Sequence, residues 1–136
     1  MRQIAYTEGY KYQLAEDYHV VIDIRPHVPV STRYIRLGQD GSLFIRQDYA
    51  WDGPSGPAID TPNFMRGSLV HDVLYQLIRA GLLDDSYRAR ADAILHEICR
   101  EDGMSAIRAW WVHLGVRFGG SAAVRPSAEP VVMRAP

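Results

Sequence analysis

The sequence predicts an α+β protein, with a small antiparallel β-sheet in the N-terminal half followed by three helices in the C-terminal half. Up to about residue 50, short aromatic and β-branched segments alternate with turn residues, which is typical of strands. After residue 61 the apolar residues recur with helical spacing, and glycines follow each periodic segment. Runs of strands followed by runs of helices indicate the α+β class.

The first strands are expected at residues 10–14 and 19–24, where aromatic and β-branched residues are frequent. A hairpin follows, because residues 34–37 and 43–46 alternate between apolar and polar side chains. Between them lies Gly-Gln-Asp-Gly at residues 38–41, which supplies residues that adopt the positive φ angles of a tight turn.

The first helix is expected to begin near Pro62, since proline suits the first turn of a helix, and to end at Gly81. The second helix is expected at residues 85–102 and the third at residues 105–118. The third helix is expected to end at the glycines at 119–120.

The length of 136 residues and the apolar content of 47% fit one domain with one core, which we expect at residues 1–120. Residues 121–136 contain three prolines and no periodicity. This composition predicts an extended or flexible C-terminal arm.

The charge balance and the apolar pattern exclude some partners. With 15 basic and 16 acidic side chains, the chain has no overall field that would attract nucleic acid. It has no apolar run of the roughly 18 residues that a transmembrane segment needs, and no signal-like N-terminus, so synthesis in the cytoplasm is expected. Cys99 is the single cysteine and is expected to be a buried apolar residue.

The candidate catalytic residues lie on the first two helices. His71 and Tyr75 lie at the edge of the apolar arc of the first helix, and Asp92 lies at the border of the apolar arc of the second. If the helices meet there, Asp92 would accept the Nδ1 proton of His71, and Nε2 would be left to take a proton from water. The same pair could instead be a structural hydrogen bond that joins the two helices.

A calcium site is the candidate metal centre. The turn after Asp52 contains glycines and prolines, so its backbone carbonyls, including that of Gly53, could face a cation. Asp72 neighbours His71 and could add a second carboxylate. The alternative is a rigid connection from strand to helix, in which the glycines allow unusual φ angles and the prolines fix the backbone.

On the third helix, Ile107, Trp111, Leu114 and Phe118 are expected to form the core stripe. Trp110 would then lie on the more exposed side, as a candidate for an interface or for contact with lipid.

Between about residues 30 and 120 the sequence resembles a small phage and prophage protein family of unknown function. The resemblance implies a phage-derived protein and supplies no activity. It is carried by an ordered set of motifs, namely Tyr34-Ile35-Arg36-Leu37, Asp40-Gly41-Ser42-Leu43, the segment from Tyr49 to Ser55, His71-Asp72-Val73-Leu74-Tyr75, Arg88 and Ala91-Asp92.

The sequence also resembles phospholipase A2, especially its smaller bacterial members. The shared features are a glycine-containing loop with an aspartate, then His-Asp-x-x-Tyr on a helix, then an aspartate on the next helix. This resemblance implies that His71 is the base, that Asp72 and Asp52 are calcium ligands, that Asp92 holds His71, and that Tyr75 supplies a supporting hydroxyl. The metal would polarise the ester carbonyl and stabilise the oxyanion.

The expected function is therefore that of a phage-derived, virion- or tail-associated protein with a phospholipase A2-like site, which hydrolyses lipid esters with the help of Ca²⁺. The alternative is a non-catalytic tail component that binds neighbouring subunits through its C-terminal arm. A third possibility is a cell-wall or lysis accessory hydrolase that acts on an amide. The expected partners are phage virion or tail proteins, and the expected location is the host cytoplasm during synthesis and then the virion.

Overall fold

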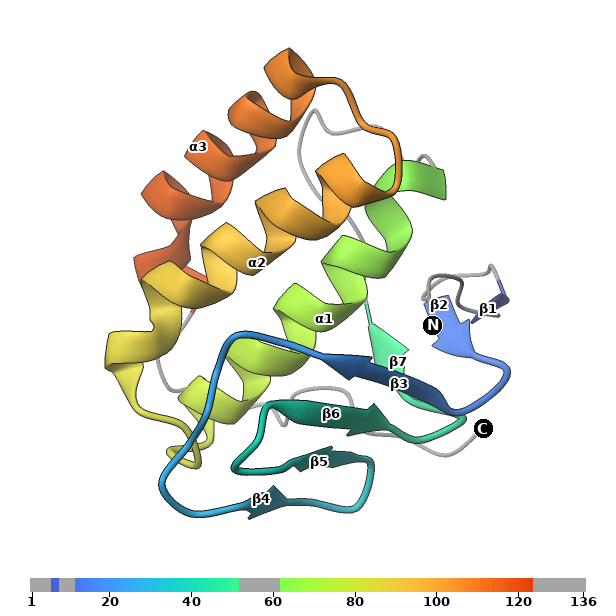
Figure 1. The fold of residues 1–136 in the computed structure, drawn as a ribbon, viewed down its shortest axis with the longest axis vertical. Helices are drawn as coiled ribbons and strands as arrows, with labels where there is room; N and C mark the ends of the chain where they lie inside the picture. Colours follow the sequence, from blue (N-terminus) through green and yellow to red (C-terminus); the bar gives the residue numbers. More distant parts are fainter. Residues whose placement is uncertain (1–5, 8–11, 52–61, 124–136) are drawn as a thin grey trace. The chain divides into compact units, whose positions relative to one another are not determined.

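The computed structural model (Figure 1) describes residues 6–7, 12–51 and 62–123. They divide into two compact units, a strand unit within residues 1–52 and a helical unit within residues 53–127. Antiparallel strands come first in the chain and helices follow, so the predicted α+β class is confirmed.

The strand unit contains two antiparallel sheets. One has the strand order β1-β2-β7 and the other has the order β3-β6-β5-β4. The described strands are Tyr6–Thr7 (β1), Tyr12–Leu14 (β2), Tyr18–Val21 (β3), Val30–Ser31 (β4), Ile35–Leu37 (β5), Ser42–Ile45 (β6) and Ala50–Trp51 (β7).

The predicted hairpin is formed by β5 and β6. Ile35 pairs with Ile45, and the Gly38 amide donates to the Ser42 carbonyl across the turn at 2.9 Å. Gly41 has a φ of +88°, and a Cβ there would lie 2.3 Å from the Ile22 carbonyl oxygen. Both the turn geometry and this close backbone approach therefore require glycine at position 41.

The helical unit contains α1 (Pro62–Arg79), a short 3₁₀ turn η1 (Asp85–Tyr87), α2 (Arg88–Glu101) and α3 (Ala106–Ala123). Gly81 and Gly103 follow α1 and α2 with φ angles of +75° and +98°, as the sequence predicts for residues that end a helix.

The third helix extends further than its sequence predicts. It runs through the glycines at 119–120 and reaches Ala123. A glycine inside a helix lowers its stability by about 1 kcal/mol but keeps its backbone hydrogen bond, so it weakens a helix without necessarily ending it. The first three residues of the predicted arm at 121–136 are therefore helical, and the rest of that arm, residues 124–136, lies outside the described residues.

The core of the helical unit joins all three α-helices. Cys99 is fully buried in it, and burial raises the pKa of its thiol to about 12, so it is an inert apolar residue as predicted. Among the helices that the structure describes, none combines the length and apolarity needed to cross a bilayer. The core cluster consists of Phe64, Leu95, Cys99, Met104 and Ala109, with Val112 packed against it.

The predicted core stripe of α3 is wrong for two of its residues. Ile107 and Trp111 are 74% and 64% exposed, whereas Ala109 is fully buried and Val112 packs against the core cluster. The prediction placed the larger apolar side chains of this helix in the core. The close packing of α3 instead selects small ones, since alanine allows a nearer approach of the helix backbone.

Gly67 sets the separation of α1 and α2. A Cβ at this position would lie 2.9 Å from both Cys99 Sγ and Leu95 Cδ1, which is closer than carbon atoms pack. Since Gly67 lies in the middle of α1, it reduces the intrinsic stability of that helix. The two helices therefore approach each other at a point where no larger residue fits.

We predict that Gly67→Ala destabilises the protein by about 1–3 kcal/mol, because the added methyl group overpacks the contact with α2. Glycine-to-alanine changes at open helix positions act in the opposite direction, by up to about 1 kcal/mol. Urea unfolding followed by circular dichroism measures the sign. A stabilised Gly67→Ala variant would show that the helices are not in contact there.

Candidate functional site

The candidate site is a hydrogen-bonded group formed by His71 and Tyr75 of α1 and Asp92 of α2. His71 Nε2 lies 2.7 Å from Asp92 Oδ1, and the Tyr75 hydroxyl donates to the same oxygen at 2.5 Å. The rings of His71 and Tyr75 lie 4.1 Å apart between centroids. The structure thus brings together the three residues that the sequence predicts as catalytic, and we call them the His-Asp-Tyr group.

The helical spacing explains why these side chains meet. His71 and Tyr75 are four residues apart, so they lie one above the other on the same face of α1. Gly67 lies one further turn toward the N-terminus on that face, and its close contact with Leu95 holds α2 near α1. Asp92 lies almost one turn before Leu95, so its carboxylate faces His71.

A buried arginine makes a second polar connection between α1 and the end of α2. Arg66 is 3% exposed, and its Nε and Nη2 donate to the two oxygens of Asp102 at 2.9 Å each. Its Nη2 also donates to Glu101 Oε1 at 2.5 Å. Sequence reasoning missed both Arg66 and Gly67. Only Gly67 could have been found from the sequence, since a small residue one turn before His71 indicates a close approach of another helix.

The nitrogen that faces Asp92 is not the one predicted. The sequence-based expectation was Nδ1, but Nε2 makes the contact, and Nδ1 lies 3.9 Å from Asp72 Oδ1. Nε2 is at the tip of the ring and can reach a neighbouring helix. Nδ1 is close to Cγ and remains beside its own helix, where Asp72 is the next residue. Nδ1 is therefore the ring nitrogen that Asp92 does not contact.

Burial and charge act against each other on His71. Burial by itself lowers the pKa of the imidazole, but contacts with Asp72 and Asp92 raise it, and the net effect is a pKa above the ordinary value of 6.5. The side chain of His71 is 10% exposed and that of Asp92 is fully buried. The protonated ring is therefore stabilised between two carboxylates.

The described residues supply only part of a calcium site. The side chain of Asp72 is 36% exposed and could offer a carboxylate beside His71. Across residues 6–7, 12–51 and 62–123, no group of three or more histidine, cysteine, aspartate or glutamate side chains could hold a metal ion. The other two predicted ligands, Asp52 and Gly53, lie outside the described residues.

His96 makes none of the hydrogen bonds of the His-Asp-Tyr group. Its ring lies 5.5 Å from that of His113 on α3, between centroids. His96 therefore belongs to the contact between α2 and α3. Because it lies in the same unit but outside the His-Asp-Tyr group, a substitution of His96 is a suitable control for substitutions of His71.

Residues 57–116 match the protein family described as "Protein of unknown function (DUF1353)". The matched segment includes α1, α2 and the beginning of α3, and with them the whole His-Asp-Tyr group. No curated protein and no solved structure matches the chain. The match agrees with the expected family of unknown function and leaves the phage origin a prediction.

We predict that the charge of His71 stabilises the fold at low pH. Because its folded-state pKa is raised, this contribution is fully present below about pH 6.5 and is lost as the pH rises through the folded-state pKa. Urea unfolding at a series of pH values should show a decline above pH 6.5 in wild type and in the control His96→Gln, but not in His71→Gln. Parallel pH profiles for wild type and His71→Gln would contradict this electrostatic role.

Proposed function

We propose that this protein is a phospholipase A2-like hydrolase that cleaves ester bonds in lipids, with His71 as the general base. One observation supports this function above all. Asp92 contacts His71 at Nε2, and Tyr75 donates to the same oxygen of Asp92, so the imidazole is held in one orientation. With its hydrogen on Nε2, the ring would keep the Nδ1 lone pair for a water molecule.

In this mechanism Nδ1 of His71 accepts a proton from water as the water oxygen attacks the ester carbonyl. The proton then passes from Nδ1 to the leaving alcohol oxygen as the carbon–oxygen bond breaks, which yields a fatty acid and an alcohol. Asp92 accepts the Nε2 hydrogen, which selects the correct tautomer and stabilises the imidazolium that forms. Tyr75 donates to the same carboxylate oxygen and restrains it.

The electrostatic environment makes this base dependent on pH. Below its raised pKa, His71 holds a proton on each nitrogen and cannot accept another. The rate should therefore increase with pH and reach its plateau above the ordinary pKa of 6.5.

We include Ca²⁺ in the proposal, with Asp72 as one ligand and Asp52 and the Gly53 carbonyl as the others. Asp72 supports this because its partly exposed carboxylate lies beside Nδ1. Oxygen donors are the ligands that calcium prefers, and a bound calcium ion would polarise the ester carbonyl. None of the proton transfers above depends on the ion.

The biological setting that we propose follows from the resemblance to phage and prophage proteins. The protein would be made in the host cytoplasm, bind virion or tail proteins, and act on a lipid substrate after delivery by the particle or by lysis. Purified virions probed for this chain by mass spectrometry provide a direct check on that setting.

A non-catalytic role as a virion or tail component is the second candidate. It is favoured by the burial of the imidazole, because a buried side chain that is hydrogen-bonded to the neighbouring helix also serves as a structural connection. Under this candidate the exposed Trp110 and Trp111 of α3 would contact neighbouring subunits. The C-terminal arm would contribute to the same contacts.

We predict that the wild-type protein releases fatty acid from phosphatidylglycerol vesicles in the presence of calcium, and that His71→Gln lowers the rate by about 100-fold or more. Tyr75→Phe should lower it less, since Asp92 still holds the ring. His96→Gln is the matched control and should keep full activity. If folded wild-type protein releases nothing, or His71→Gln stays active, the hydrolase proposal fails.

We predict that calcium raises the melting temperature of the wild type, because a ligand that binds only the folded state stabilises it. Asp72→Asn should abolish most of this increase, whereas Asp85→Asn, at an exposed aspartate of the same unit, should retain it. Differential scanning fluorimetry with calcium chloride provides the comparison, with magnesium chloride as the control salt. Equal responses of wild type and Asp72→Asn would remove Asp72 from the metal site.

A further inference from the structure

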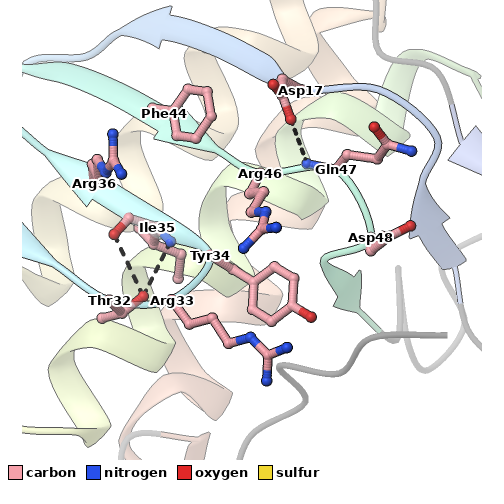
Figure 2. A pocket seen from close by; sticks show the side chains of 10 residues that line it. All are labelled: Asp17, Thr32, Arg33, Tyr34, Ile35, Arg36, Phe44, Arg46, Gln47 and Asp48. Carbon is pink, nitrogen blue, oxygen red and sulfur yellow. Dashed lines mark hydrogen bonds between the residues drawn. The ribbon is translucent and has the colours of Figure 1, made fainter.

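A hollow in the strand unit is lined by three arginines. It has a volume of about 390 Å³ and is shown in Figure 2. Arg36 lies on β5, Arg33 precedes that strand, and Arg46 follows β6. All of the lining residues belong to the strand unit, and none of them is a member of the His-Asp-Tyr group.

Strand alternation explains how Arg36, Arg46 and two aromatic rings share one face. The apolar residues Ile35 and Ile45 point to the buried face of the hairpin and are not exposed. Their neighbours therefore point to the other face, where Arg36 is paired with Phe44. The Arg46 amide donates to the Tyr34 carbonyl at 2.7 Å, which sets the next cross-strand pair.

The aromatic rings support the guanidinium groups. The Cζ atoms of Arg33 and Arg46 lie 5.4 and 5.7 Å from the centroid of the Tyr34 ring, and that of Arg36 lies 5.7 Å from the centroid of Phe44. At these distances the cations are attracted to the ring faces. This stacking restricts the side chains while leaving their N–H donors free for another partner.

These arginines have no ion-pair partner among the described residues, which distinguishes them from Arg66 and Arg25. Arg66 binds two carboxylates, and Arg25 pairs with Asp23 at 3.1 Å. No such carboxylate contact is made by the arginines of the hollow.

Two carboxylates also line the hollow, and they reduce its positive charge without cancelling it. Asp17 Oδ1 accepts a hydrogen bond from the Gln47 backbone amide at 2.7 Å, which Figure 2 shows as a dashed line. Asp48 adds a second negative charge to the lining. The three guanidinium groups exceed the two carboxylates, so the lining keeps a net positive charge that favours an anion.

We propose that this hollow binds a phosphate group through Arg33, Arg46 and Arg36. A guanidinium group donates two parallel hydrogen bonds to a phosphate, and such charge-assisted bonds are about twice as strong as neutral ones. A phosphate carries close to two negative charges near neutral pH and has several acceptor oxygens, so it can engage more than one arginine. A monocarboxylate has one negative charge and two oxygens, so it offsets less of the positive charge of the three arginines.

The phosphate could belong to a lipid headgroup or be free in solution, and the experiment has one arm for each source. In the first arm, sodium phosphate is titrated into ¹⁵N-labelled wild-type protein, with sodium chloride of equal ionic strength as the reference. The arginine Nε–Hε signals of Arg33 and Arg46 should shift and saturate, whereas that of Arg25 should not. In the second arm, binding is measured by sedimentation with phosphatidylcholine vesicles that contain or lack phosphatidic acid.

The matched variants are Arg33→Gln/Arg46→Gln and the control Arg25→Gln. The double variant should bind the phosphate or the phosphatidic acid vesicles about tenfold more weakly or worse, and the control should bind as the wild type does. Selective capture by phosphatidic acid vesicles identifies a headgroup, and a shift with sodium phosphate alone identifies a free phosphate. The proposal is overturned if sodium phosphate shifts no wild-type arginine signal and phosphatidic acid vesicles do not sediment the wild type, or if the double variant binds like the wild type. The wild-type titration decides the matter if the double variant does not fold.

Discussion

The burial of the Asp92 carboxylate is the constraint on which the helical unit depends. Its side chain has no exposed surface, and a carboxylate in that position is strongly unfavourable unless hydrogen-bond donors surround it. His71 and Tyr75 provide such donors from the neighbouring helix, and both contact the same oxygen. A shift of α1 along α2 would separate these atoms. The carboxylate therefore fixes the register of the two helices, while Gly67 fixes their separation.

The same contacts can hold two helices together and prepare a base, so the structural and catalytic roles differ only in the use of His71 Nδ1. A purely structural group would leave this nitrogen idle beside Asp72. In the hydrolase that we propose, Nδ1 exchanges a proton with water, and the cost of burying Asp92 serves to orient the ring. The raised pKa of His71 follows from the two carboxylates. The protonated ring that stabilises the fold is therefore not the neutral ring that the proposed reaction requires.

The local parts of the fold were predictable because they depend on nearby residues. The turn at residues 38–41 and the helix ends at Gly81 and Gly103 follow from backbone preferences that act within a few positions. The meeting of His71 with Asp92 also followed from helical spacing, since both lie at the edges of apolar arcs.

Features that depend on the distance between elements could not be read from the sequence. Periodicity locates a residue on a helix face but not the rotation of its ring, so the wrong nitrogen of His71 was assigned to Asp92. It also favoured the large Trp111 for the core, although the packing of α3 selects Ala109. The stacking of Arg46 on Tyr34 was missed because it can be predicted only once the register of β5 and β6 is known.

The central claim is that Asp92 holds the Nε2 hydrogen of His71 and leaves Nδ1 with a free lone pair. The ¹⁵N chemical shifts of the His71 ring, measured by NMR at a pH above its raised pKa, test this claim most directly. We predict that Nε2 carries the hydrogen and that Nδ1 has the shift of an unprotonated nitrogen. If the hydrogen is instead found on Nδ1, the orientation of the base is contradicted, and with it the proposed hydrolysis.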